Sequence, residues 1–293
     1  MHSESSAQRL LPISILFCVL DGMIEPYEEH NFSTCHLRGG YAILDQWTNI
    51  PTRMLLQDGW QTHLLSLYTT IDLVHTLLTG EKPFFEPMIW RMFANAQTWF
   101  GRLGVGDRFL EILAAFSDMA ALGNIVYANL PLDSARLVEK CLAPIEAIFD
   151  FSLSQEVFFD DPNTSLSSPW ESFCSIYDIC GIIYLQRALR LRSIGDEMVQ
   201  AATRRGVEKL KDGNLPEMMR HCVIFPILVI GSHCNLAQDR RAILEALSTS
   251  SSYLAFGNMP LMVDFLRTTW ARKEVHATWW ETFASVSQKT FLF

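Results

Sequence analysis

The chain has 293 residues, of which 49% are hydrophobic and 19% are charged. This composition is typical of a packed globular protein and excludes a disordered chain. The formal net charge of −9 excludes non-specific binding to nucleic acid, because an acidic surface repels the phosphate backbone. The 15 glycines and 12 prolines are too few for the many tight turns of a β-sandwich.

The cysteines and the apolar runs indicate an intracellular protein without a membrane span. The seven cysteines are odd in number and widely spaced, which is typical of reduced, buried thiols. No apolar run reaches the roughly 18–20 residues that cross a bilayer. The run Leu10–Leu20 resembles the apolar region of a signal peptide, but no small-residue cleavage site follows it. We therefore expect a disordered stretch over residues 1–9 and then a buried helix from Leu10 to Met23.

Apolar residues recur at three- and four-residue spacing along most of the chain, which predicts an all-α fold. Gly80 stands where a glycine ends a helix, and Asp107 stands where a carboxylate caps one. Val223–Ile230 would also suit a strand, but its surroundings favour a helix. The remaining expected helices are Cys35–Trp47, Trp60–Leu78, the segments behind Asp107 and Asp133 (the latter kinked at Pro144), Phe173–Leu191, Asp196–Lys211, a segment capped by Asp239, and a long C-terminal segment that carries tryptophans.

One segment interrupts this pattern near the middle of the chain. Residues 160–169 read DDPNTSLSSP, a composition typical of a linker. Neither half of the chain has an obvious complete core of its own. We therefore expect a single large domain of antiparallel helix pairs over residues 10–293, with this linker inside it.

Paired carboxylates offer one candidate for chemistry. Asp160 and Asp161 resemble half of a motif that holds Mg²⁺ on a diphosphate, because Mg²⁺ prefers oxygen ligands in octahedral geometry. A third acid is missing there, and Asp21 with Glu25 is a weaker second candidate. A helical enzyme of secondary metabolism, such as an unconventional Mg-dependent isoprenoid cyclase, is the alternative that this pair supports. The competing interpretation is a solvated loop.

The other candidate sites have ordinary structural explanations. His221-Cys222 and His233-Cys234 supply zinc-ligand types, but without the close cysteine spacing of structural zinc sites they indicate core thiols beside histidines. Gly101–Gly106 lacks the context of a phosphate loop and indicates a turn. Asp72 with His75, and Glu139 with Glu146, share helix faces but converge on no nucleophile. We expect no catalytic residue, no metal site and no cofactor.

Five segments, in order, resemble those of the fungal-specific transcription factor domain, the helical regulatory region of fungal binuclear zinc cluster regulators. They are His36-Leu37-Arg38-Gly39-Gly40 with Leu44; Asp72–Pro83 (DLVHTLLTGEKP); Leu103–Leu122; Gly181–Leu189 (GIIYLQRAL); and a closing series of Phe225-Pro226, Gly231, Asp239-Arg240-Arg241, Val263–Trp270, Arg272 and Trp280. The departures are Phe225 in place of the usual Trp, and Ser232-His233 where the family often has a Cys and an acidic residue.

The resemblance implies an all-α regulatory domain that acts in the nucleus. It implies protein partners, with a homodimer among them, or an apolar small molecule as ligand. The six closely spaced cysteines of the zinc cluster are not in this sequence, so DNA binding does not carry over. We expect no direct nucleic acid contact and no membrane contact. Under the enzyme alternative the protein would be cytoplasmic.

Overall fold

The computed structural model describes residues 4–23, 33–128, 139–149, 168–212, 215–251, 258–272, 277–287 and 289. Over these residues the chain is helical and contains no β-sheet. An isolated antiparallel bridge joins Thr98 and Gly101. The predicted all-α single domain is confirmed. The helices of the N-terminal half are α1 (Glu4–Met23), α2 (Ser33–Gln46), α3 (Ile50–Gln57), α4 (Trp60–Thr79), α5 (Met88–Met92) and α6 (Arg108–Tyr127).

The C-terminal half begins with α8 (Pro169–Tyr184), which continues into a π-helix, η1 (Leu185–Leu189). It goes on with α9 (Glu197–Lys211), α10 (Glu217–Arg220), the 3₁₀ helix η2 (His221–Val223), α11 (Ile224–Ser232), α12 (Ala237–Ser251), α13 (Met259–Ala271) and α14 (Trp279–Ser287). Residues 139–149 form a further helical segment between the two halves.

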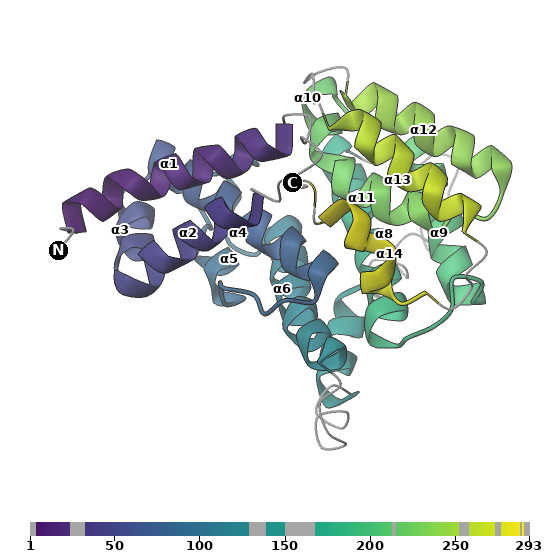
Figure 1. Cartoon of the computed structure of the whole chain (residues 1–293), viewed down its shortest axis with the longest axis horizontal. Helices are drawn as coiled ribbons and strands as arrows, with labels where there is room; N and C mark the ends of the chain where they lie inside the picture. The colour runs from purple at the N-terminus through teal and green to yellow at the C-terminus, as the bar shows by residue number, and fades with distance from the viewer. Residues whose placement is uncertain are drawn as a thin grey trace.

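Two central helices join the halves. Helix α4 packs against α6, and α6 packs against α8 and η1. The last helix, α14, returns from the C-terminal half to pack on α4, so the chain closes on its own N-terminal half (Figure 1). Helix α6 has the length and hydropathy of a membrane span, but 61% of that span is buried inside the protein. It is therefore explained as a core helix.

Helix α4 forms where the periodicity predicts it. Its residues from Tyr68 to Leu78 are buried, and buried threonine hydroxyls donate to carbonyls of the preceding turn, such as Thr69 to Leu65 O at 2.8 Å. The helix ends at Gly80, whose φ of 75° is left-handed and whose N–H donates to Thr76 O. A side chain at φ near +75° would be strained, so glycine suits this stop.

Helix α1 differs from the prediction in two ways. It begins at Glu4, so residues 4–9, which we expected to be disordered, belong to it and Pro12 lies in its interior. It was also expected to be buried on nearly all sides, yet only one face is. Ala7, Leu11, Ile15 and Cys18 are at most 1% exposed, whereas the opposite face is about half exposed. An apolar sequence on every side predicts burial only when other elements cover every side.

Three local predictions are confirmed by the structure. Val223–Ile230 is helical, as part of η2 and α11, and α11 is buried along its whole length. Asp107 caps α6, since its carboxylate accepts from Phe109 N at 2.9 Å. Gly101 and Gly106 have positive φ in a turn before α6.

Other predictions of element boundaries are wrong. Asp239 lies in the first turn of α12, which already begins at Ala237. The long tryptophan-bearing helix is two helices, α13 and α14. Within Ile89–Trp99, which lacks clear periodicity, the helix α5 ends at Met92. Asp133 and residues 160–167 of the expected linker lie outside the described residues, while Ser168 forms a capping box with Glu171 at the start of α8.

Candidate functional site

Two of the buried polar junctions among the described residues are built around Asp72 and Arg187, which belong to the motifs above. In the first, the Asp72 carboxylate accepts from the Tyr41 hydroxyl at 2.5 Å. It also accepts from Phe84 N at 3.2 Å and from Phe85 N at 3.2 Å, both in the loop that follows α4. Asp72 is only 1% exposed. We call this set (Asp72, Tyr41, Phe84, Phe85) the Asp72 junction.

The Asp72 junction ties three segments together. Tyr41 comes from α2, Asp72 from α4, and the Tyr41 ring stacks on Phe84 with centroids 4.6 Å apart. Burial raises the pKa of Asp72, while its hydrogen-bond donors act to lower it. The pKa of Tyr41 is raised by burial and by the neighbouring carboxylate. Every oxygen of the carboxylate is occupied by this chain, so the arrangement suits a structural joint rather than proton transfer.

His75, the predicted companion of Asp72 on the helix face, points to a different partner. Its Nε2 lies 3.6 Å from Glu81 Oε2. Arg38 reaches the other oxygen of Glu81 at 3.4 Å across a largely exposed surface. These contacts fasten the loop after Gly80 to α2 and α4 and bring no nucleophile near Asp72.

The second junction begins where α8 widens into the π-helix η1. The N–H of Arg190 donates to Leu185 O at 2.9 Å, which is the five-residue spacing of a π-turn. Such turns are rare and frequently accompany functional sites. Here the turn leaves Gln186 and Arg187 buried, at 7% and 3% exposure. In the sequence Arg187 stands in the last turns of a predicted helix, where basic residues suit the negative helix end, and this pattern does not indicate its burial. Its position four residues after buried Ile183 was the available signal.

Arg187 binds acceptors from three separate segments. Its Nε donates to His233 Nε2 at 3.2 Å, and one terminal nitrogen donates to Ala277 O at 2.8 Å. The other terminal nitrogen donates to Arg192 O. All three partners are neutral, and burial lowers the pKa of Arg187. Because an arginine side chain stays protonated in proteins, this is a cation held in the core by dipoles alone.

His233 is fixed as a neutral imidazole by its two contacts. Its Nδ1 lies 2.7 Å from Val229 O and donates there, which leaves Nε2 to accept from Arg187. Burial, and then the Arg187 charge, lower the pKa of His233 to about 3. The ring stacks on Trp279 at 5.9 Å with an interplanar angle of 22°. Trp279 Nε1 in turn donates to Leu77 O at 2.8 Å.

A continuous set of contacts therefore runs from η1 through the end of α11 to α14 and the last turn of α4. We call Arg187, His233, Trp279 and their buried neighbours Tyr184 and Gln186 the Arg187 junction. Tyr184 packs edge-on against Trp279, with centroids 4.9 Å apart. This junction holds α14, the helix that closes the domain.

Buried polar atoms without partners cluster around the same place. Within the described residues, Tyr184 Oη, Gln186 Oε1 and Trp280 Nε1 are buried and make no hydrogen bond. A buried donor or acceptor left unpaired costs about 1–3 kcal/mol, unless a water fills the gap. The Arg187 junction is therefore less well satisfied than the Asp72 junction.

The other predicted candidates make separate structural contacts or lie outside the described residues. Among the described residues no group of three or more His, Cys, Asp or Glu side chains could hold a metal ion. Cys222 lies beside its own neighbour His221 at 3.3 Å, and Cys234 is buried at the end of α11. Glu139 and Glu146 both bind Arg190, at 3.0 and 2.7 Å. Asp160, Asp161 and Glu25 lie outside the described residues, and so does the side chain of Asp21.

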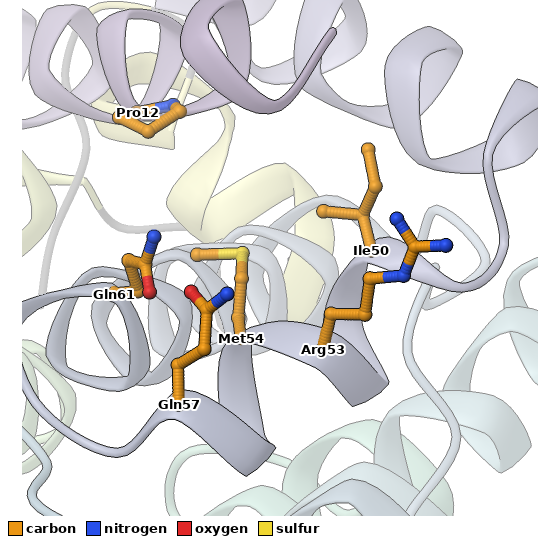
Figure 2. A pocket seen from close by; sticks show the side chains of 6 residues that line it. All are labelled: Pro12, Ile50, Arg53, Met54, Gln57 and Gln61. Carbon is orange, nitrogen blue, oxygen red and sulfur yellow. The ribbon is translucent and has the colours of Figure 1, made fainter. Parts of the chain in front are cut away.

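Two hollows are candidate ligand sites. One lies between α1, α3 and α4, where Pro12, Met54 and Gln61 face a common space (Figure 2). Its volume of about 20 Å³ is enough for one water molecule and no more. The other, of about 420 Å³, is an open surface hollow along α9 lined by Arg204, Arg205, Glu208, Lys209 and Asp212. Charged and open, it differs from the enclosed apolar pockets that bind small molecules.

The comparison with known families decides the class of the protein. The profile of the fungal specific transcription factor domain matches residues 2–293. The chain belongs to the fungal specific transcription factor domain family. No curated protein and no solved structure matches the chain. Membership in this family supports a regulatory role in transcription.

The motifs that resemble this fungal transcription factor domain hold the two junctions. Asp72, Gly80 and Pro83 of the second segment build the loop held by the Asp72 junction. Arg187 of the fourth segment lies at the centre of the Arg187 junction. In the closing series, Trp270 Nε1 donates to Gly231 O at 2.8 Å and Arg240 lies over the Trp270 ring at 5.5 Å. The motif residues are thus the joints between helices of this domain.

Proposed function

We propose that this chain is a regulatory domain that controls transcription in the nucleus through contacts with proteins. Within these 293 residues we expect neither a DNA-binding module nor a cofactor. The family match over residues 2–293 carries the proposal. The net charge of −9 and the sequence without a six-cysteine cluster support the part that concerns DNA.

A protein fits better as partner than a small apolar molecule. The hollow between α1, α3 and α4 has room for a single water, and the one along α9 is lined by charges. In contrast, α1 presents large apolar side chains to solvent. Exposed apolar patches on a soluble domain mark interaction sites. We therefore place the regulatory contact on a helical surface.

A reporter assay tests this role. The full chain is fused to an unrelated DNA-binding domain whose site lies upstream of a reporter gene in a fungal host. We expect the reporter output to differ from that of the DNA-binding domain alone at equal protein abundance. An unchanged output from a folded, nuclear fusion would overturn the regulatory role.

A second measurement tests the part that concerns DNA. In a gel-shift titration, the purified chain should leave a random duplex unshifted at low and at physiological salt. A shift that weakens steeply as salt rises would contradict this part, because it would reveal phosphate contacts.

A further inference from the structure

The outer face of α1 carries a line of large apolar side chains. Leu10, Ile13, Phe17 and Leu20 are 45–47% exposed, and Leu16 beside them is 50% exposed. Figure 1 shows α1 along the outer edge of the N-terminal half. We call Leu10, Ile13, Phe17 and Leu20 the α1 stripe. The opposite face of the same helix is buried in the domain, so the stripe belongs to a helix that is already held in place.

The spacing of the α1 stripe indicates its partner. Steps of three, four and three residues are the a and d positions of a heptad repeat, the pattern by which one helix packs along another. The four positions also lie symmetrically about residue 15, since 10 and 20, and 13 and 17, are equally far from it. A second α1 running antiparallel would therefore set Leu10 opposite Leu20 of the second copy, and Ile13 opposite its Phe17.

We propose that the α1 stripe is a dimer interface that pairs with the α1 stripe of a second copy in antiparallel orientation. A surface that matches itself under a two-fold axis is what a symmetric dimer requires. Phe17 is held for this contact by stacking on His36 of α2, with centroids 4.8 Å apart. A side chain that is already ordered loses less conformational entropy on binding.

A membrane surface suits α1 less well than a second copy does. Helices that bind membranes carry many basic residues, and Arg9 is the single one in α1.

The available area sets the strength of the dimer. Five large side chains, each about half exposed, amount to roughly 400–500 Å² of apolar surface per copy, taking about 180–200 Å² for each full side chain. A standard interface buries about 800 Å² per partner, and smaller ones are weak or transient. The dimer should therefore dissociate in the micromolar range. This inference rests on the proposed function only in taking a protein as the partner.

Sedimentation of the purified full chain tests the interface. The wild-type chain should change from monomer to dimer as its concentration rises to about 100 µM, in line with a small interface. Ile13→Glu should raise the dimer dissociation constant more than about a hundredfold, because symmetry places the charge in the interface twice. The matched control is Met198→Glu, since Met198 is 49% exposed on α9, and it should leave dimerisation unchanged.

Each contrary outcome overturns the inference. These are a wild-type chain that stays monomeric at about 100 µM, a dimer that Ile13→Glu leaves intact, and a monomer that instead binds anionic lipid vesicles. Circular dichroism checks that the variants fold. Leu10→Glu, nearer the end of the helix, replaces Ile13→Glu if the latter unfolds. A monomeric chain that still alters the reporter output would refute the dimer and leave the regulatory role supported. A dimeric chain that leaves the reporter output unchanged would support the dimer and refute the regulatory role.

Cross-linking tests the orientation. In a background with Cys35→Ser, which removes the exposed native thiol, Ile13→Cys and Phe17→Cys proteins are mixed under mild oxidation. Antiparallel pairing sets position 13 against position 17 of the other copy, so the mixture should form more disulfide dimer than either protein alone. Equal cross-linking by each protein alone would contradict the antiparallel arrangement, because parallel pairing sets each position against itself.

Discussion

The Asp72 junction and the Arg187 junction do the same task with opposite chemistry. Each ties a central helix to a segment distant in the sequence by means of a buried ionisable side chain. Asp72 is met by three donors and makes use of both oxygens. Arg187 is met by three neutral acceptors, and the polar atoms of Tyr184, Gln186 and Trp280 around it lack partners within the described residues.

The difference shows which part of the domain is built to stay closed. The Asp72 junction fastens a loop between neighbouring helices of the N-terminal half. The Arg187 junction holds α14, which arrives from the other end of the chain and packs on α4. A junction whose buried polar atoms lack hydrogen bonds opens at a lower free-energy cost. Segments that move in a protein usually lie in such regions of low local stability. We therefore expect α14 to separate from the core before the α4 loop does.

The largest effect is expected from Asp72→Ala. The substitution leaves the Tyr41 hydroxyl and the Phe84 and Phe85 amides without an acceptor, so the free energy of unfolding should fall by about 4 kcal/mol. Denaturant unfolding followed by circular dichroism measures the loss. Asp264→Ala, which removes an exposed acid, is the control and should change stability by less than about 0.5 kcal/mol. A loss at Asp72 as small as that of the control would show that the junction contributes no stability.

A somewhat smaller effect is expected from Arg187→Met. Methionine leaves three acceptors unpaired but also removes a buried charge, and the net loss should be about 3 kcal/mol. Arg187→Lys should be worse than Arg187→Met, because a lysine ammonium is strongly hydrated and cannot reach three divergent acceptors. Wild-type stability in Arg187→Lys would show that the charge alone matters. Limited proteolysis should cut Arg187→Met within α14 sooner than wild type.

The two junctions should respond to pH with opposite sign. His233 has a pKa of about 3 in the folded state against 6.5 in the unfolded state, so acid favours the unfolded state and stability is lost as pH falls below 6.5. The free energy of unfolding then falls by up to about 1.4 kcal/mol for each pH unit, which gives a loss of about 2 kcal/mol between pH 6.5 and 5.0. His233→Gln should lose less stability than wild type over that interval, by about this amount.

Asp72 supplies the counterpart. Its folded pKa is raised above 3.8, so the unfolded state loses its proton first and this group's stabilisation is lost as pH rises above 3.8. Asp72→Asn should remove that downward slope. Denaturant titrations of wild type, His233→Gln and Asp72→Asn at several pH values separate the two groups. Parallel pH profiles for all three proteins would contradict both assignments.

The sequence predicts the helices of this domain well where one face is apolar and the ends are marked. Gly80 and Asp107 mark such ends, and α4 and α6 begin and end close to the prediction. The burial of helix α1 was predicted wrongly, because both of its faces are apolar and only one is covered by other helices. Periodicity reports which residues avoid water, and it does not report whether the surface that covers them belongs to the same chain.

The junctions were harder to predict than the helices. Asp72 was singled out as a chemical candidate, but its partners are amides of a loop, and side-chain patterns carry no information about backbone donors. Arg187 stands in the last turns of a predicted helix, where a basic residue suits the negative end whether it is buried or exposed. The π-turn that buries it depends on packing against the end of α11 and the approach to α14, which lie 46 and 90 residues away.

The smallest and most specific effects concern two tyrosine hydroxyls. Tyr68 Oη donates to Leu37 O at 2.5 Å, whereas Tyr184 Oη has no partner within the described residues. Tyr68→Phe should therefore cost about 1 kcal/mol, and Tyr184→Phe should be neutral or slightly stabilising. Thermal unfolding of the two variants measures the contrast. Equal losses would show that an ordered water satisfies Tyr184.

A glycine faces each hydroxyl, and it allows a double-mutant test of the same contrast. A Cβ at Gly123 would lie 2.2 Å from Tyr184 Oη, with the next ring atom at 3.5 Å. A Cβ at Gly40 would lie 2.1 Å from Tyr68 Oη and 2.6 Å from the ring carbon behind it. Tyr184→Phe should therefore rescue Gly123→Ala almost fully, while Tyr68→Phe should leave Gly40→Ala destabilised by about 1–3 kcal/mol. Rescue at both sites, or at neither, would contradict the difference in geometry between the two tyrosine hydroxyls.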